Sequence, residues 1–143
     1  MTDDGNIALI KRAVQAVNAG TMAQEGPEIV AADFQRHDLA AALPDAAGPG
    51  GLSNFIDMVR TALPDFKMEP VDIISAGDRA VMRWVGSGSH QGEFLGVAPT
   101  GKRIEWNAIS IYGIRDGKLS DSWQLIDVWG ILKQMGAVRG PGD

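Results

Sequence analysis

The sequence predicts an α+β fold in which helices come first and an antiparallel sheet follows. Hydrophobic residues recur every three or four positions in the first half of the chain and follow strand-like runs in the second half. Helices and strands do not alternate along the chain, so a parallel sheet is not expected. We therefore expect about four long, strongly curved strands with helices packed on one face of the sheet.

Three helices are predicted in the first half. Apolar residues spaced by three and four predict a first helix that stops at Gly20. A second helical segment is predicted over residues 27–38, with a proline in its first turn. Residues 41–51, rich in proline and glycine, are predicted to form a loop. A third helix is then expected over residues 52–63, with Pro64 ending it.

Four strand-like runs make up the second half. Two runs lie within residues 68–90 on either side of a turn, and a third covers residues 103–114. The fourth begins at Leu119 and passes into a last helical segment. Gly86, Gly88 and Gly92 are positions at which a strand can bend sharply or form a bulge.

Composition limits the classes of function. The 143 residues fit one domain, with residues 137–143 expected to form a mobile tail. The formal net charge is -5 and no basic cluster is present, which argues against a nucleic-acid partner. Without cysteine, and with only two isolated histidines, neither a metal site nor a cofactor is predicted. No apolar run suits a signal peptide or membrane span, so a cytoplasmic protein is expected.

Residues 63–136 carry a set of short motifs that resemble a known family. They are "PDF", "GDRAVMRW", "GSHQGEFLGVAPTGK", "YGIRDGK" and a final "WQLIDVWG". With them the chain resembles the SnoaL-like polyketide cyclases of the nuclear transport factor 2-like superfamily. The resemblance implies a cone-shaped fold whose curved sheet and helices enclose a pocket for a hydrophobic small molecule, usually in a homodimer.

Two classes of function stay open, because this fold hosts several activities. One is a cofactor-independent cyclase or isomerase that acts by acid–base proton transfer on a hydrophobic carbonyl compound, either polyketide-like or aromatic. An intramolecular aldol condensation is the example that the resemblance implies. The other is a small-molecule binding protein, or a hydratase or epoxide-hydrolase type of enzyme, that uses the same cavity.

Asp127 is the first catalytic candidate. In the cyclases that this chain resembles, an aspartate on the last strand is the acid–base residue, and Asp127 matches that position. In a regular strand Asp127 shares one face with Leu119 and Trp123, so its carboxylate is expected to project into the pocket. From there it can remove a proton next to a carbonyl and return it to the new alkoxide. Alternatively, Asp127 caps the last helix, and the two roles do not exclude each other.

The two histidines are further candidates. His90 ends the strand face that contains Met82 and Trp84, where it can assist proton transfer or hydrogen-bond a substrate oxygen. The alternative, which the sequence favours, is that His90 anchors the turn that follows it. His37 stands at the end of the second predicted helical segment, where it either contacts the pocket or acts as a structural anchor.

Large rings and polar side chains supply the remaining candidate contacts. The four tryptophans and the single tyrosine can form a flat slot for an aromatic ligand, or they can pack in the core. The family's cyclases have a histidine on the penultimate strand, where this chain has Tyr112 and Gly113. A cyclase here would therefore use Tyr112, Gln124 or Asn107 to stabilise an enolate oxygen. The candidate substrate-binding residues are His37, Trp84, Trp106, Tyr112, Trp123 and Gln124.

Overall fold

The structure, a computed structural model, describes residues 2–38 and 46–143, which contain four helices and one six-stranded sheet. The helices are α1 (Asp3–Ala19), α2 (Met22–Ile29), α3 (Gly48–Ala62) and α4 (Val128–Gln134). The strands are β1 (Val30–Asp38), β2 (Ala46–Ala47), β3 (Lys67–Ala76), β4 (Arg79–Ser89), β5 (Arg103–Arg115) and β6 (Lys118–Ile126).

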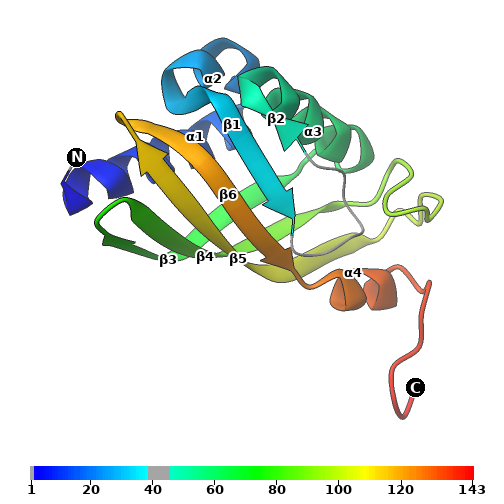
Figure 1. Cartoon of the computed structure of the whole chain (residues 1–143). Coiled ribbons are helices and arrows are strands. Elements are labelled where there is room, and N and C mark those ends of the chain that lie inside the picture. Colours follow the sequence, from blue (N-terminus) through cyan, green and yellow to red (C-terminus); the bar gives the residue numbers. More distant parts are fainter. Residues whose placement is uncertain (1, 39–45) are drawn as a thin grey trace.

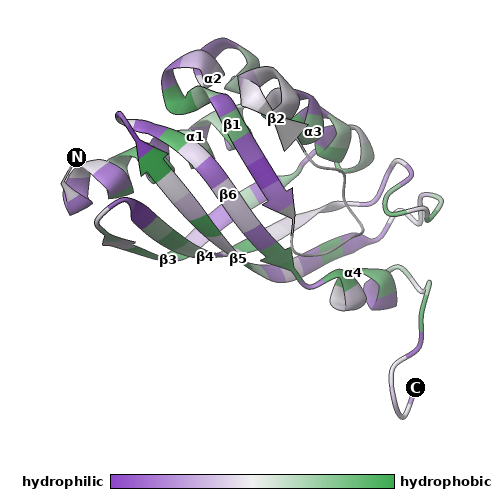
Figure 2. Cartoon of the chain, in the orientation of Figure 1, coloured by the Kyte–Doolittle hydropathy of each residue, from purple (hydrophilic) through white to green (hydrophobic). Residues whose placement is uncertain are grey.

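The sheet has the order β2-β1-β6-β5-β4-β3 and curves around the three N-terminal helices (Figure 1). Strands β3 to β6 form the antiparallel meander that the sequence predicts. Figure 2 shows hydrophobic and hydrophilic positions interleaved along these strands, as expected for a sheet whose two faces differ. The α+β prediction is confirmed.

The first helix forms as predicted. The Thr2 side chain accepts a hydrogen bond from the Gly5 amide at 3.1 Å, which caps the N-terminus of α1. Gly20 ends the helix in the left-handed conformation, with φ of 73°, where glycine carries no steric cost. The buried side of α1 packs against α2 and β3, and so forms part of the core inside the curved sheet.

The second predicted helix is wrong over residues 30–38. Helix α2 ends at Ile29, and its proline lies near its end rather than in its first turn. Strand β1 follows directly and runs parallel to β6. Phe34 and Arg36 are buried whereas Gln35 and His37 are exposed, which is the two-residue period of a strand. Pairing with β6 therefore determines the conformation of residues 30–38, and it overrides the local helical pattern.

The stretch predicted as a loop is only partly described. Residues 46–47 form the short strand β2, and α3 already begins at Gly48, which is earlier than predicted. The rest of the predicted loop lies outside the described residues. Helix α3 ends before Pro64, as expected, and it packs against β1 and α2.

Of the two alternatives for Gly86 and Gly88, the structure excludes a bulge against β5. The register between β4 and β5 is unbroken over the whole of β4. A Cβ atom on Gly86 would overlap the indole ring of Trp106, and one on Gly88 would lie 2.9 Å from the Leu63 Cβ atom. These glycines therefore allow neighbouring side chains to approach the strand closely.

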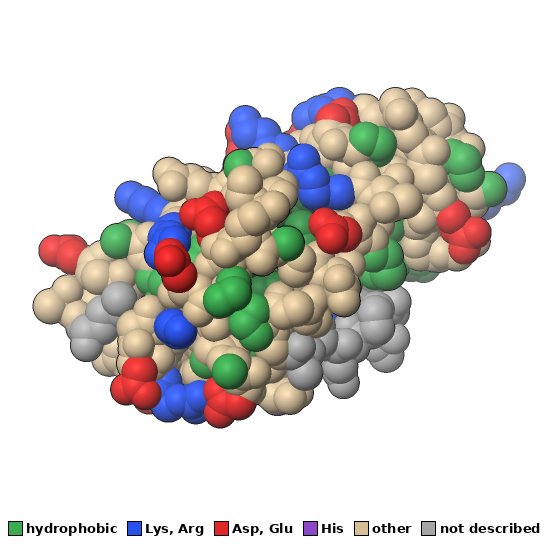
Figure 3. All heavy atoms as spheres, turned by 90° about the horizontal axis from the view of Figure 1, so that it is seen from above, with side chains coloured by type: hydrophobic (Ala, Val, Ile, Leu, Met, Phe, Trp, Pro, Cys, Tyr) green, Lys and Arg blue, Asp and Glu red, His purple; other side chains and the backbone are tan. Residues whose placement is uncertain are grey.

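The surface carries charges of both signs. Seen from above, acidic and basic side chains are interspersed among polar and hydrophobic ones (Figure 3). In the described part of the chain, no helix combines the length and the apolar character that crossing a membrane requires. The mobility of residues 137–143 stays a prediction.

Candidate functional site

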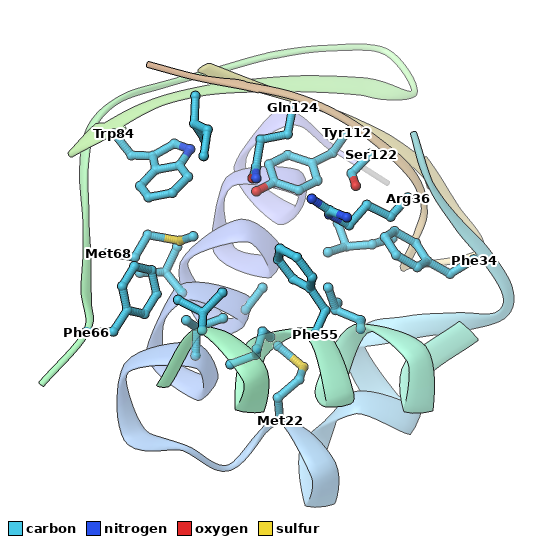
Figure 4. A pocket seen from close by; sticks show the side chains of 18 of the residues that line it. Met22, Phe34, Arg36, Phe55, Phe66, Met68, Trp84, Tyr112, Ser122 and Gln124 are labelled. Atoms are coloured by element: carbon cyan, nitrogen blue, oxygen red, sulfur yellow. The ribbon is translucent and has the colours of Figure 1, made fainter. Parts of the chain in front are cut away.

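An internal pocket lies between the helices and the inner, concave face of the sheet (Figure 4). Its walls are mainly apolar side chains, with Met22 and Phe55 on the helices and Phe66, Met68 and Trp84 on the sheet side. The cavity volume is about 90 Å³. An apolar cavity of about 150 Å³ holds benzene. Even a ligand with a single ring must therefore reach out of this cavity or displace flexible methionine side chains.

The sheet register explains why polar groups meet in this pocket. Ser122 of β6 pairs with Arg36 of β1 on one side and with Tyr112 of β5 on the other. Two residues further along β6, Gln124 pairs with Ser110 of β5. Because residues two apart in a strand share a face, these side chains all point to the concave side. Figure 4 shows the ends of Gln124, Tyr112, Ser122 and Arg36 gathered beneath the sheet.

A chain of hydrogen bonds connects three of the inner strands. The indole Nε1 of Trp84 donates to Ser110 Oγ at 3.0 Å, and Ser110 Oγ donates to Gln124 Oε1 at 3.2 Å. Burial raises the pKa of the Tyr112 phenol, and a hydrogen bond with Ser110 opposes that shift. Tyr112 therefore keeps its proton at neutral pH and can serve as a hydrogen-bond donor.

Arg36 places a permanent positive charge beside these groups. Its side chain is 3% exposed, and its guanidinium carbon lies 3.8 Å from the centre of the Phe55 ring. A guanidinium over an aromatic face gains cation–π attraction, which supports the charge in an apolar setting. Because arginine only donates hydrogen bonds, this corner of the pocket favours an electron-rich oxygen.

The described lining of the pocket contains no aspartate, glutamate or histidine. Its polar side chains are the arginine, tyrosine, serine and glutamine described above, and arginine cannot accept a proton. The described residues also contain no group of three or more His, Asp or Glu side chains that could hold a metal ion. The arrangement is suited to binding and polarising a carbonyl oxygen, which is the role of an oxyanion site.

Asp127 does not line the pocket, so its predicted placement is wrong. It is exposed, and its Oδ1 accepts a hydrogen bond from the Gly130 amide at 2.9 Å. The alternative is confirmed, because Asp127 is the N-cap of α4. The odd-numbered residues Asp121, Trp123 and Leu125 lie on the outer face of β6, whereas Ser122 and Gln124 face the pocket.

His90 is buried, but the predicted contact with the pocket is wrong. Its Nδ1 accepts a hydrogen bond from the Thr100 amide at 3.2 Å, so the opposite nitrogen Nε2 carries the proton. Nε2 lies 3.2 Å from the Val97 carbonyl oxygen. Both ring nitrogens therefore bind the loop between β4 and β5, as the anchoring alternative expected.

His37 and Trp123 are also placed outside the pocket. Their rings stack with centres 5.1 Å apart on the outer face of the sheet, and His37 Nε2 lies 3.1 Å from Asp121 Oδ1. The guanidinium carbon of Arg79 lies 4.8 Å from the Trp123 ring centre on the same face. The structural-anchor alternative for His37 agrees with this geometry.

Four of the predicted substrate contacts do line the pocket: Trp84, Trp106, Tyr112 and Gln124. Sequence reasoning missed Arg36, because the segment that contains it was predicted to be a helix. The available signal was strand alternation. In a strand, residue 36 shares a face with Phe34, so Arg36 stands where an apolar residue would be expected.

Comparison with known proteins agrees with the fold. The family model described as "SnoaL-like polyketide cyclase" matches residues 8–135. The nogalonic acid methyl ester cyclase of Streptomyces nogalater is 30% identical over 90 residues, which are 62% of this chain and 67% of that protein. The aklanonic acid methyl ester cyclase DnrD of Streptomyces peucetius is 24% identical over 131 residues, which are 91% and 90% of the two chains.

Among solved structures, TsrD of Streptomyces laurentii superimposes with a TM-score of 0.84 at 24% identity, covering 96% of this chain and 99% of the other. This likeness supports the cone-shaped α+β fold. The family model spans nearly the whole described fold, from α1 to the end of α4. The chain therefore belongs to the SnoaL-like polyketide cyclase family.

Proposed function

We propose that this protein closes a ring on a hydrophobic, polyketide-like carbonyl compound bound in the internal pocket, without a cofactor. Family membership and the cyclase activity named for two relatives support the reaction type. The observation that carries the proposal is an apolar pocket whose donor groups, Arg36, Tyr112 and Gln124, gather on one wall.

In an intramolecular aldol condensation, a carbon next to a carbonyl loses a proton, and the resulting enolate attacks a second carbonyl. Negative charge collects first on the enolate oxygen and then on the new alkoxide. Tyr112 and Arg36 can stabilise both oxygens, since neighbouring donors in a dry site interact strongly with developing charge. Tyr112 can also deliver a proton to the alkoxide.

The proton that leaves carbon goes to an acceptor outside the described lining, because Asp127 caps a helix and His90 anchors a loop. A carbon flanked by two carbonyl groups is acidic enough to be deprotonated by a weak base such as water. We therefore assign stabilisation of the enolate, rather than a carboxylate base, as the main contribution of the protein.

The alternative is a protein that binds such a compound without converting it. The lack of a carboxylate or imidazole in the described lining favours this alternative. Water addition and epoxide opening use the same cavity but need a group that activates water, so we rank them lower.

The test is turnover of the two methyl esters that the relatives cyclise, followed by chromatography of the products. We expect wild-type protein to form a cyclised product, and Tyr112→Phe to lower kcat by about tenfold or more, since a donor to an oxyanion is lost. Arg36→Met should lower it further, whereas Arg83→Met, on the outer face beside Asp72, is the matched control. Tight binding of either ester without any product would select the binding protein.

The same proposal includes a homodimer, formed through the outer face of the sheet. Ile74, Ile109 and Leu125 project from three strands of that face and are 65%, 50% and 53% exposed. Exposed apolar side chains on neighbouring strands form a patch of the kind that protein interfaces cover. A two-fold axis would place this patch against its own copy, with the Arg83–Asp72 ion pair lying beside Ile109.

Analytical ultracentrifugation tests the dimer. We expect Ile109→Glu to convert a dimer into a monomer, because two charges would meet in an apolar contact. Met58→Glu, which adds the same charge at an exposed apolar residue of α3, is the control and should leave the dimer intact. A monomeric wild type would refute the dimer and leave the pocket proposal unaffected. We also propose a cytoplasmic location, which cell fractionation can test.

A further inference from the structure

The hydrogen bonds around Gln124 determine which end of its amide group faces a ligand. Trp84 can only donate through Nε1, so Ser110 Oγ must accept that bond. Ser110 carries a single proton, and it donates that proton to Gln124 Oε1. The carbonyl oxygen of the amide is thus held by the protein, and its nitrogen points elsewhere.

The nitrogen of Gln124 has no protein acceptor in the described structure, although Gln124 belongs to the lining of the pocket. An amide nitrogen has two protons to donate, and leaving them unbound in an apolar site costs free energy. Tyr112 lies on the same wall, and its phenol is hydrogen-bonded to Ser110. Within the described structure the amide nitrogen of Gln124 therefore lacks an acceptor, and a ligand can supply one.

We propose that Gln124 determines ligand specificity by donating a hydrogen bond from its nitrogen to a carbonyl or enolate oxygen, and that Trp84 and Ser110 hold the amide in that orientation. This inference rests on the proposed function, since it concerns a ligand of the same pocket. It specifies the chemistry of that ligand: an aromatic or other flat apolar body with an electron-rich oxygen at the end that meets β5 and β6.

Four single-ring probes, which are small aromatic ligands that carry the groups to be compared, test the inference. Acetophenone carries a carbonyl acceptor, and ethylbenzene has a similar shape without one. Benzoate carries an anionic acceptor, and benzylammonium carries a cationic donor. Dissociation constants from ligand-observed NMR titration give the preference for an acceptor as the ratio of the ethylbenzene and acetophenone values.

The variants separate the donor from its supports. Gln124→Met preserves the length of the side chain but removes the donor. The acceptor preference should therefore fall by roughly tenfold, which is the contribution of one hydrogen bond to the binding constant. Ser110→Ala frees the amide and should lower the preference by a smaller factor. Ser120→Ala, a buried serine of β6 outside the pocket lining, is the matched control and should leave it unchanged.

Gln124→Glu provides a readout that a purely structural role would not change. A carboxylate at this position accepts instead of donating, so benzoate binding should weaken while benzylammonium binding strengthens. Ethylbenzene binding reports whether each variant keeps an intact pocket, and circular dichroism reports whether it folds.

The possible outcomes are distinct. An acceptor preference that falls in Gln124→Met and Ser110→Ala but not in Ser120→Ala supports the inference. An unchanged preference in Gln124→Met, with ethylbenzene still bound, overturns the inference and leaves the pocket as a binding site. Failure of all four probes to bind the wild type overturns the inference and the proposed function together.

Discussion

The two faces of strand β6 differ in a way that its composition does not suggest. The outer face presents Trp123 and Leu125, whereas the inner face presents Ser122 and Gln124. By hydrophobicity alone the outer set would be placed in the core. The helices nevertheless cover the other face, so the polar set is enclosed and the apolar set is left open in the single chain.

This difference teaches that enclosure, rather than polarity, gives a side chain its chemical role. A hydrogen bond such as that from Trp84 to Ser110 acts in a dry interior, where electrostatic interactions are strong. The contact between His37 and Asp121 is partly exposed, so water and salt weaken it. The inner face is therefore suited to the proposed reaction, and the outer face is available for the proposed dimer.

The largest effect should come from comparing a tryptophan on each face. Trp106 is buried against Phe66, and replacing it by alanine should lower the free energy of unfolding by about 3–5 kcal/mol. Trp123→Ala should cost roughly 1 kcal/mol in the monomer, because Trp123 is only partly buried. Urea denaturation at two protein concentrations measures both values.

Protein concentration makes this test more informative. If the outer face forms a dimer, the cost of Trp123→Ala should rise with concentration while that of Trp106→Ala stays constant. Equal costs for the two variants at low concentration would show that the two faces are equivalent, and would end the comparison.

A smaller effect is expected where the inner face has no room. Gly86→Ala places a methyl group in the ring of Trp106, and overpacking of this kind costs about 1–3 kcal/mol. Gly50→Ala, in α3, meets no atom within 4 Å and should be neutral or slightly stabilising. Thermal unfolding of both variants provides the measurement, and a neutral Gly86→Ala would contradict the close approach.

Most of the fold follows from the sequence, and the exception has a physical cause. Turn residues and β-rich runs locate the meander, and the helical period locates α1 and α3. Strand β1 escapes because its pairing partner, β6, lies about 85 positions further along the chain. A local sequence pattern contains no information about a partner that far away, so the prediction for this segment was a helix.

The pocket could be predicted only in part, for a related reason. The contributions of β4 and β5 follow from strand alternation, which places Trp84, Trp106 and Tyr112 on the more apolar face of each strand. In β6 both faces mix polar and apolar residues, so the choice of face depends on tertiary packing. Because of this packing, Gln124 lines the pocket, whereas Asp127 and Trp123 lie outside it.

Asp127→Ala should distinguish a cap from a catalyst. Loss of the hydrogen bond to Gly130 removes the N-cap of α4 and should cost about 1 kcal/mol in the free energy of unfolding. Turnover or ligand affinity per folded molecule should not change, since the carboxylate lies outside the pocket. Asp127→Asn, which can still cap, is the control. Abolished turnover in a folded Asp127→Asn would return this residue to the mechanism.

The smallest effect concerns the end of β4, where Asp65 binds Ser89. The Ser89 amide and hydroxyl donate to the two carboxylate oxygens at 2.6 Å and 2.8 Å, and they hold the pKa of Asp65 below its usual range. Because the folded pKa is below the unfolded one, the stabilisation is complete above the unfolded value, about 3.9, and is lost as pH falls through the folded pKa.

This pH dependence can be isolated with Asp65→Asn. The side chain is exposed, so the stabilisation should stay below about 1 kcal/mol. Wild type should exceed the variant in stability at about pH 6, and the difference should shrink towards about pH 2 as the carboxylate takes up its proton. Other carboxylates contribute equally to both proteins and cancel in the difference. A difference that does not depend on pH would assign the effect to packing at the end of β4 instead of to the ionised carboxylate.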